Sequence, residues 1–582
     1  MRTMPVPSPS AADKIDIPLH AAMARASMSL SHVSMLLAWL DWALHLAISP
    51  GKRLELVRLA LWQAEALFHY GQDCAVSGPI HAKCCVQPPT QDRRFTAEAW
   101  QLWPFNVLHQ SFLLTERWWD AATRGVWGVS RHHEDLVAFA ARQWLDIASP
   151  GNQLITNPVV LQRTAEQHGA NLVRGALHAL ADFERYLSNA PPPGANDFVP
   201  GRNVAVTPGK VVLRNRLIEL IQYAPATPAV YAQPILIVPA WIMKYYILDL
   251  SPANSLIRYL VEHGHTVFCI SWKNPGEADR DLAMNDYLEL GIMAALDVVN
   301  ATVPGQRVHA TGYCLGGTLL SMAAAAMARD NDDRLASMTL FAAHTDFADP
   351  GELGLFIDEA QISLLDAQMT ETGYLTAGQM AGAFQMLRSY DLLWSRMVGD
   401  YLMGDRAPLN DLMAWNADTT RMPARMHGEY LRRLFLNNDL SEGRYPVRGK
   451  PVSLADITLP VFVVGTETDH VAPWRSVYKL HHLCPAELTF VLTSGGHNAG
   501  IVSPPGHPRR HFHMKTRRAG ASSLAPDVWL STATDEPGSW WPAWHAWLVA
   551  HGAGDQAAKP PSLGTLAHPP LADAPGTYVL ER

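Results

Sequence analysis

A glycine-flanked cysteine, Cys314, constrains the fold of this chain more than any other feature. It lies in residues 312–317 (GYCLGG), after a short strand-like run and before a long run of Leu, Ala and Met. The glycines allow the backbone to turn sharply and to approach neighbouring strands without a Cβ clash. A strand, a tight turn and a helix in this order expose a nucleophile above a sheet. Because a thiolate at a helix N-terminus is stabilised and strongly nucleophilic, we expect Cys314 to be catalytic; the alternative is a small buried residue in a structural turn.

Strand-like and helical patterns alternate around this turn. Apolar runs typical of strands lie at 211–223, 235–238, 266–272, 308–311, 338–341, 459–464 and 488–492, with helical patterns at 255–263 and 283–300. This alternation predicts a parallel sheet with helices on both faces. Between the strands near 341 and 459 it stops in a helical stretch rich in Met, Leu and Trp. We therefore expect an α/β-hydrolase core at 198–552, with a helical cap inserted at about 347–455.

The first 190 residues follow a different pattern, in which helical spacing dominates. We expect residues 1–20 to be a flexible tail and 21–190 to form a mostly helical N-terminal domain. Residues 189–194 (NAPPPG) are the clearest linker in the chain and mark the main domain boundary. At the other end, 553–582 are rich in Ala, Pro and Gly, which predicts an extended C-terminal tail.

Two apolar segments of the helical domain could contact a membrane or a partner. One is a stripe at helical spacing, formed by Leu54, Val57, Leu61, Ala64, Leu67 and Phe68. Such a stripe usually faces a core, and the alternative is a surface that docks on an apolar phase or a partner. The other is 28–48, which is interrupted by His32, Asp41 and His45. A span needs about 20 apolar residues, so we expect a packed or interfacial helix and no transmembrane span.

Charge and cysteine content limit the function classes. The chain has 46 basic and 54 acidic residues and a net charge of −8, which argues against general nucleic-acid binding. Its six cysteines are scattered, without a CxxC pair or a Cys/His metal spacing. We therefore expect a reducing cytoplasm, no bound metal and no cofactor. Residues 1–16 lack the basic and apolar regions of a secretory signal, which agrees with a cytoplasmic location.

A nucleophilic cysteine needs a base, and the base needs an orienting group. In α/β-hydrolases these follow the nucleophile in the order acid, then histidine. Asp469, just past a late strand, is the candidate acid, with Glu467 as its local competitor. His497, in a Gly-Gly-His run after the next strand, is the candidate base. The backbone N–H groups of Leu315 and Trp241 are expected to form the oxyanion hole.

Several segments together resemble one family, the poly(3-hydroxyalkanoate) synthases (class I-like), which polymerise bacterial storage polyesters. The turn is similar to the family's Gly-x-Cys-x-Gly-Gly box. Further similar segments are VPAWIMKYYILDL at 238–250, ISWKNP at 270–275, DLLW at 391–394, DHVAPW at 469–474 and GSWWP at 538–542. The resemblance covers about residues 95–550. It implies that Cys314 is the nucleophile, that Asp469 and His497 are its partners, and that the growing polyester is held on the cysteine.

The same resemblance implies the partners and the location. The substrate would be a hydroxyacyl-CoA and the product a polyhydroxyalkanoate, with a homodimer acting at the surface of polyester granules. The chain departs from the family pattern at Asn498, which follows the histidine where an apolar residue is expected. Pro239 is followed by Ala240 instead of a second proline, and Tyr390 stands where the family has Asn. These departures concern substrate range more than the chemistry.

Several alternatives stay open at this point. CoA is strongly anionic, so Arg388, His470 and Arg475 are candidate CoA contacts, and each could equally be an ordinary solvated charge. Either His497 or Asp469 could activate the hydroxyl that extends the chain. A thioesterase or acyltransferase would use the same triad without polymerising. A non-catalytic granule-associated protein would keep the fold without the activity.

Overall fold

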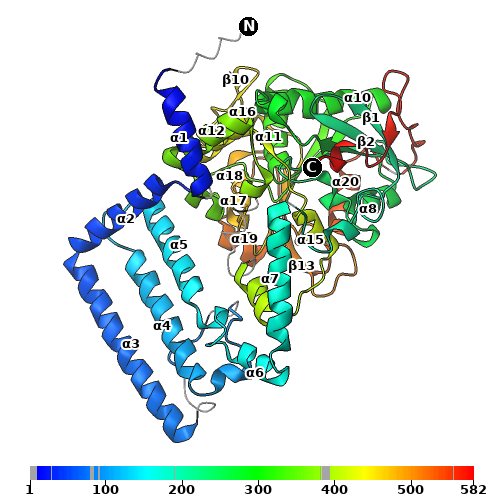
Figure 1. The fold of residues 1–582 in the computed structure, drawn as a ribbon. Coiled ribbons are helices and arrows are strands. Elements are labelled where there is room, and N and C mark those ends of the chain that lie inside the picture. Colours follow the sequence, from blue (N-terminus) through cyan, green and yellow to red (C-terminus); the bar gives the residue numbers. More distant parts are fainter. Residues whose placement is uncertain are drawn as a thin grey trace. The chain divides into compact units, whose positions relative to one another are not determined.

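The computed structural model describes residues 10–27, 29–78, 84–88, 92–188, 190–380, 382, 393–554 and 556–582. The chain forms two compact units (Figure 1). The sheet unit comprises the chain up to Ser29 together with Pro193–Ala381 and Leu409–Arg582, and the helical unit comprises Leu30–Pro192 and Gly382–Pro408. The division between Pro192 and Pro193 falls within the proline-rich segment 189–194.

The sheet unit is built on an 11-stranded sheet in the order β14-β13-β12-β11-β6-β5-β3-β4-β2-β1-β15. Its strands are β1 (Gly209–Arg214), β2 (Ile218–Tyr223), β3 (Ile235–Val238), β4 (Val267–Trp272), β5 (Val308–Tyr313), β6 (Leu335–Phe341), β11 (Val461–Thr466), β12 (Leu488–Thr493), β13 (His511–Arg517), β14 (Thr534–Pro537) and β15 (Ala572–Asp573). Strands β4, β3, β5, β6, β11 and β12 pair in parallel, and the flanking strands pair antiparallel. The predicted parallel sheet is confirmed, and the run at 211–223 proves to be a hairpin.

Helices cover both faces of this sheet. The helices next to the central strands are α8 (Leu256–Glu262), α10 (Ala294–Thr302), α11 (Leu315–Arg329) and α20 (Trp541–Ala550). The strand order reverses after β4, so right-handed crossovers place α8 on one face and α10 and α11 on the other. Helix α20 lies with α8, since the rings of Trp541 and Tyr259 are 5.5 Å apart. The central strands are buried on both faces, which explains their continuous apolar sequences.

The predicted cap, 347–455, divides between the two units. Its elements in the sheet unit are α12 (Glu359–Thr372), β7 (Tyr374–Leu375), α15 (Asp411–Asn416), β8 (Met422–Pro423), α16 (Ala424–Tyr430), the π-helix Leu431–Leu436, β9 (Pro446–Val447) and β10 (Lys450–Pro451). Residues Gly382–Pro408 instead belong to the helical unit. There the side-chain amide of Asn171 donates to the Leu402 carbonyl (2.8 Å), and Gly175 packs directly against the backbone of Tyr401.

Both predicted tails contain ordered structure. Helix α1 (Asp13–Ala26) begins within the expected tail 1–20 and packs on α12, because its small side chains Ala21 and Ala24 allow close approach. Arg25 at its end forms an ion pair with Glu371 of α12. At the other end, β15 pairs with β1. The buried carboxylate of Glu219 binds the C-terminal segment by accepting the backbone N–H groups of Thr577 (2.8 Å) and Tyr578 (2.9 Å).

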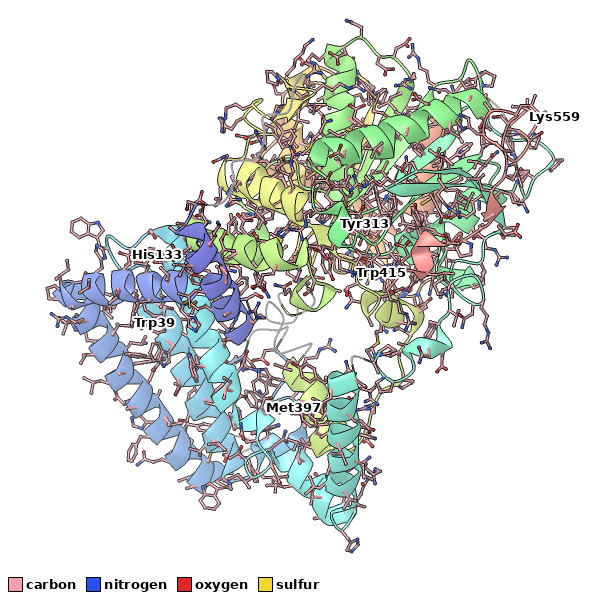
Figure 2. All side chains as sticks on the ribbon, turned by 45° about the horizontal axis from the view of Figure 1, so that its top comes forward. Trp39, His133, Tyr313, Met397, Trp415 and Lys559 are labelled. Atoms are coloured by element: carbon pink, nitrogen blue, oxygen red, sulfur yellow. The ribbon has the colours of Figure 1, made fainter. Side chains whose placement is uncertain are left out.

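The helical unit packs long helices around an aromatic cluster. Its helices are α2 (His32–Ala47), α3 (Pro50–Ser77), α4 (Phe105–Thr123), α5 (Arg131–Ala148), α6 (Pro158–Glu166), α7 (Ala170–Ser188) and α14 (Ser395–Met397), the last continued by a π-helix at Val398–Leu402. Met397, labelled in Figure 2, marks the short segment that packs along α7. Phe95, Trp100 and Phe112 form the core of the cluster. Beside them, Arg94 is buried in ion pairs with Asp92 and Glu116.

The apolar stripe of α3 does not face a core, so the first of its two interpretations is wrong. Leu54, Val57, Leu61 and Phe68 are 50–66% exposed. The buried side of the helix instead carries Leu56, Gln63 and Tyr70. Within the described residues, no single helix is long and apolar enough to cross a membrane; α2 and α3, bent by 89° at their junction, have the length and composition of a broken span only as a pair.

Candidate active site

The elbow after β5 presents Cys314 at the first turn of α11. Its backbone has φ 52° and ψ −123°, a left-handed conformation that costs a non-glycine residue energy. Two hydrogen bonds stabilise this backbone conformation. The Cys314 N–H donates to the Phe341 carbonyl of β6 (2.8 Å), and the Cys314 carbonyl accepts from the N–H of Gly317 (2.9 Å). The side chain remains partly exposed, so the predicted nucleophile is accessible at the C-terminal edge of the sheet.

The glycines of the elbow are required by close backbone contacts. A Cβ on Gly316 would lie 2.5 Å from the carbonyl oxygen of Pro239 and closer still to that of Val238. A Cβ on Gly317 would lie 2.5 Å from the Cβ of Ala343. Real Cβ atoms do not approach backbone this closely, so the turn can sit against β3 only because these positions lack side chains.

Gly316→Ala is therefore expected to destabilise the sheet unit by about 1–3 kcal/mol and to displace Cys314. The unfolding temperature would measure the loss of stability, and the catalytic rate would measure the displacement of Cys314. Gly378→Ala is the matched control, because no atom lies within 4 Å of a Cβ built there. Equal unfolding temperatures for the two variants would contradict the packing argument.

The acid and the base lie at the same edge of the sheet. Asp469 follows β11 and His497 follows β12, and the Nδ1–H of His497 donates to the Asp469 carboxylate at 2.8 Å. The carboxylate also accepts the hydroxyl of Thr466 and the backbone N–H groups of Val471 and Ala472, each at 2.8 Å. Its side chain has no exposed surface. Asp469 is thus held by four donors, whereas Glu467 points to His511 instead.

Burial and charge act against each other at this pair. Burial by itself would raise the pKa of Asp469, but the His497 charge and the hydrogen bonds from His497, Ala472 and Thr466 outweigh it and lower the pKa. Burial likewise disfavours a charged ring at His497, yet the Asp469 carboxylate and the sulfur of Cys314 raise the pKa of His497 well above its usual range. With Nδ1 on Asp469, Nε2 is the ring nitrogen left to bond with Cys314. The arrangement favours an imidazolium beside the Asp469 carboxylate.

The two predicted oxyanion donors lie on segments that meet at the elbow. Leu315 is the first residue of α11, and Trp241 lies on the buried segment after β3, against which Gly316 packs. Among the described residues, neither backbone N–H has a hydrogen-bond acceptor. Donors of this kind suit an oxyanion that forms during reaction.

Two tyrosines at the site were missed by the sequence reasoning. Tyr313, labelled in Figure 2, donates its hydroxyl to the side-chain oxygen of Asn498 at 2.6 Å and so joins the elbow to the histidine loop. Asn498 is one of the positions where the chain departs from the family pattern. That departure was the signal in the sequence that could have pointed to this contact. Tyr430 of α16 is buried near Cys314; burial first, and then the charge of Cys314, raise the pKa of Tyr430. Only the fold brings this part of the predicted cap to the cysteine.

Tyr313→Phe should lower the catalytic rate up to about tenfold, since one hydrogen bond contributes roughly 0.5–1.5 kcal/mol. KM should change little, because Tyr313 acts by positioning His497. Steady-state kinetics of Tyr313→Phe, Asn498→Leu and the double variant measure this. The double variant should lose no more than either single one. Additive losses would exclude a shared role for the two side chains.

The candidate CoA contacts have different surroundings. Arg388 lies outside the described residues. His470 directly follows Asp469 and is partly buried. Arg475 forms an ion pair with Asp527 and lies over the ring of Trp474, 4.8 Å from its centroid. Its charge is therefore already engaged in the protein.

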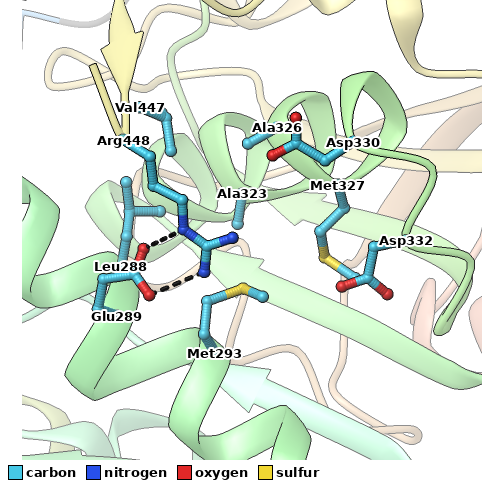
Figure 3. A pocket seen from close by; sticks show the side chains of 10 residues that line it. All are labelled: Leu288, Glu289, Met293, Ala323, Ala326, Met327, Asp330, Asp332, Val447 and Arg448. Atoms are coloured by element: carbon cyan, nitrogen blue, oxygen red, sulfur yellow. Dashed lines mark hydrogen bonds and ion pairs between the residues drawn. The ribbon is translucent and has the colours of Figure 1, made fainter. Parts of the chain in front are cut away.

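A hollow at the far half of α11 is separate from the triad (Figure 3). It is lined by Leu288, Glu289, Met293, Ala323, Ala326, Met327, Asp330, Asp332, Val447 and Arg448. The Arg448 guanidinium donates to both oxygens of Glu289, at 2.6 and 2.8 Å. This cation is thus neutralised within the chain, and Cys314 lies at the opposite end of the helix.

Three family models match the chain. Residues 91–260 match "Poly-beta-hydroxybutyrate polymerase (PhaC) N-terminus", 10–52 match "Poly-beta-hydroxybutyrate polymerase N terminal", and 233–504 match "alpha/beta hydrolase fold". The last match agrees with the observed sheet order, which confirms the predicted fold class. Solved structures found as similar include a monoacylglycerol lipase of Paleococcus ferrophilus, with TM-score 0.32 and 13% identity over 49% of this chain and 96% of that chain.

Curated relatives match over most of both chains. The poly(3-hydroxyalkanoate) polymerase of Methylorubrum extorquens is 41% identical over 89% of this chain and 84% of its own length. The poly(3-hydroxyalkanoate) polymerase subunit PhaC of Cupriavidus necator is 36% identical over 89% and 86%. At this coverage the matched stretch includes parts of both units. The chain therefore belongs to the poly(3-hydroxyalkanoate) polymerase family and is an enzyme of the acyltransferase type.

Proposed function

We propose that this enzyme polymerises 3-hydroxyacyl-CoA into polyhydroxyalkanoate with release of CoA, through an acyl group carried on Cys314. The observation that carries the proposal is the hydrogen-bonded series Asp469, His497 and Cys314 at the edge of the sheet, in a chain of this family. The order of the three residues and their placement after parallel strands match the chemistry of acyl transfer.

In the first half-reaction Cys314 is acylated. Its thiolate attacks the thioester carbonyl carbon, and the resulting oxyanion accepts the N–H groups of Leu315 and Trp241. The C–S bond to CoA then breaks, and the Nε2–H of His497 gives its proton to the departing CoA sulfur. One thioester replaces another, so the step is nearly balanced in energy and suits a cysteine better than a serine.

In the second half-reaction the 3-hydroxyl of another unit attacks the acyl-cysteine. A carbon–oxygen bond forms, the carbon–sulfur bond breaks, and the hydroxyl proton must go to a base. The surroundings of Asp469 favour His497 as that base. The Asp469 carboxylate is unexposed and already accepts four hydrogen bonds, whereas Nε2 of His497 adjoins the sulfur where the ester forms.

The exposed apolar helices support a role at a polyester surface. In addition to the apolar stripe of α3, helix α7 exposes a second apolar stripe. It is formed by Val173, Leu177, Leu180 and Phe183, each about 60% exposed. Contiguous apolar stripes of this kind mark docking surfaces more often than free ones. We infer that the helical unit adsorbs to the product granule. Leu61→Glu with Phe68→Glu should lower co-sedimentation with polyester particles, and Asp73→Lys on the same helix serves as a charge control.

Incubation of the purified enzyme with short- and medium-chain 3-hydroxyacyl-CoA tests the function. Free CoA and polymer are followed together by chromatography. Polymerisation predicts CoA release accompanied by a polyester and little free hydroxy acid. A thioesterase would release one hydroxy acid for each CoA, and a non-catalytic granule protein would release neither. Either of those outcomes would overturn the proposal.

A further inference from the structure

Two histidines and a glutamate form a cluster next to the turn that carries Asp469. The two histidines lie on strand β13. His511 and His513 alternate with Phe512, so both imidazoles lie on one face while Phe512 is buried on the other. Glu467 reaches the same place from the turn after β11. The side-chain ligand atoms of Glu467, His511 and His513 all lie within 4.8 Å of one another.

Two of the three residues, Glu467 and His511, are already in contact. The Glu467 carboxylate and Nε2 of His511 are 3.0 Å apart, which an ion pair accounts for. In the described part of the chain, His513 has only a long ion pair, with Asp535. Its Nδ1 is buried and, among the described residues, has no hydrogen-bond partner. The Asp535 carboxylate on β14, directly opposite in register, is 3.9 Å from that nitrogen, beyond hydrogen-bond distance.

A buried polar nitrogen without a hydrogen-bond partner is destabilising, so a ligand for His513 would stabilise the fold here. Two imidazoles and a carboxylate suit Zn²⁺, Co²⁺ or Ni²⁺, whereas Mg²⁺ and Ca²⁺ prefer oxygen ligands alone. Ligand atoms around one Zn²⁺ lie roughly 3.3 Å apart, given Zn–N bonds of about 2.0 Å. The spacing of Glu467 and His511 already suits this, and a small rotation would bring His513 to the same ion. Asp535 or water would complete a four-coordinate site.

We propose that Glu467, His511 and His513 bind one divalent transition-metal ion of the zinc class. The ion would fasten the turn that carries Asp469 to strand β13, since Glu467 stands two residues before the acid. Its role is structural, because the triad completes its own hydrogen bonds without it. No metal site was predicted from the sequence because Glu467 lies 44 residues before His511 and meets it only across the sheet.

Binding of Co²⁺ to the untagged full-length chain tests this site. The Cys314→Ala background removes the reactive thiolate as a competing ligand. We expect one equivalent of Co²⁺ to bind with the visible absorption of nitrogen and oxygen ligands, and Zn²⁺ to displace it. His513→Ala and Glu467→Gln should each weaken binding by at least about 100-fold, above the 10–100-fold that loss of an outer-shell partner costs.

His507→Ala is the matched control, because His507 is an exposed histidine of the same segment. Its variant should bind Co²⁺ as the parent does. Zn²⁺ should also raise the unfolding temperature of the parent and of His507→Ala, but not that of His513→Ala, which gives a second readout. Equal binding by all variants, or no saturable binding at millimolar Co²⁺, would overturn the proposal. Neither result depends on polymerase activity, so the proposed function is tested separately.

Discussion

Cys314→Ala is expected to abolish both CoA release and polymer formation, with a loss on the order of 10⁴-fold or more. The physical reason is that no other nucleophile is available at the elbow: the sulfur is the atom that His497 contacts and that the first turn of α11 presents. Chromatographic measurement of CoA and polymer, with mass spectrometry of the acylated chain, would check the loss. The acyl group should be found on the peptide that contains Cys314 and should be absent from the variant.

Cys314→Ser separates the chemistry from the fold. A hydroxyl keeps the size and position of the side chain but is a far weaker nucleophile at neutral pH. We expect at least about a 100-fold slower reaction and an oxygen ester that persists longer than the thioester. Cys84→Ser, at an exposed cysteine of the helical unit, should leave the rate unchanged. Polymer made by Cys314→Ala at the wild-type rate would contradict the proposed mechanism.

The placement of Cys314, Asp469 and His497 at one edge of the sheet could be predicted because its signals are local. Each member follows a buried apolar strand, and the carboxyl ends of parallel strands meet at one edge of a sheet. Order in the chain then assigned Cys314, Asp469 and His497 without knowledge of distances. The competitor Glu467 was equally plausible by position. Its rejection required the structure, in which four donors surround Asp469.

Other features depend on long-range packing and were not predictable. The α3 stripe had the spacing of a core face, but helical periodicity does not say which of two apolar sides meets a neighbour. Leu56 and Tyr70 proved to be the buried side. Residues 1–20 were expected to be a flexible tail, but α1 begins at Asp13, because α12, some 340 residues later, supplies the surface that stabilises it. The division of the predicted cap between two units likewise depends on packing between segments that are far apart in the sequence.

Asp469→Asn is expected to slow catalysis by about 10²- to 10⁴-fold, and to do so through His497. The carboxylate is the main influence that raises the pKa of His497 against the opposing effect of burial. Without its charge, burial is less fully opposed, so the pKa of His497 falls and the imidazolium is less stable. The sulfur of Cys314 then has a weaker cationic partner. Alkylation of Cys314 by iodoacetamide, followed by peptide mass spectrometry, should be slower at pH 7 in the variant.

The same pair predicts how stability depends on pH. His497 has a raised pKa in the folded state, so its contribution is fully present below about pH 6.5 and is lost as the pH rises through the folded value. Asp469 has a lowered pKa, so its contribution is present above about pH 4 and is lost as the pH falls through the folded value. The pair therefore stabilises the fold most between about pH 4 and 6.5. Asp469→Asn should flatten the curve of unfolding temperature against pH across this window, whereas Asp333→Asn, at an exposed carboxylate 3.6 Å from Arg307, should leave its shape intact. A curve of unchanged shape for Asp469→Asn would mean that the carboxylate does not hold the imidazolium, and His497 would then have to act as a neutral base from the start.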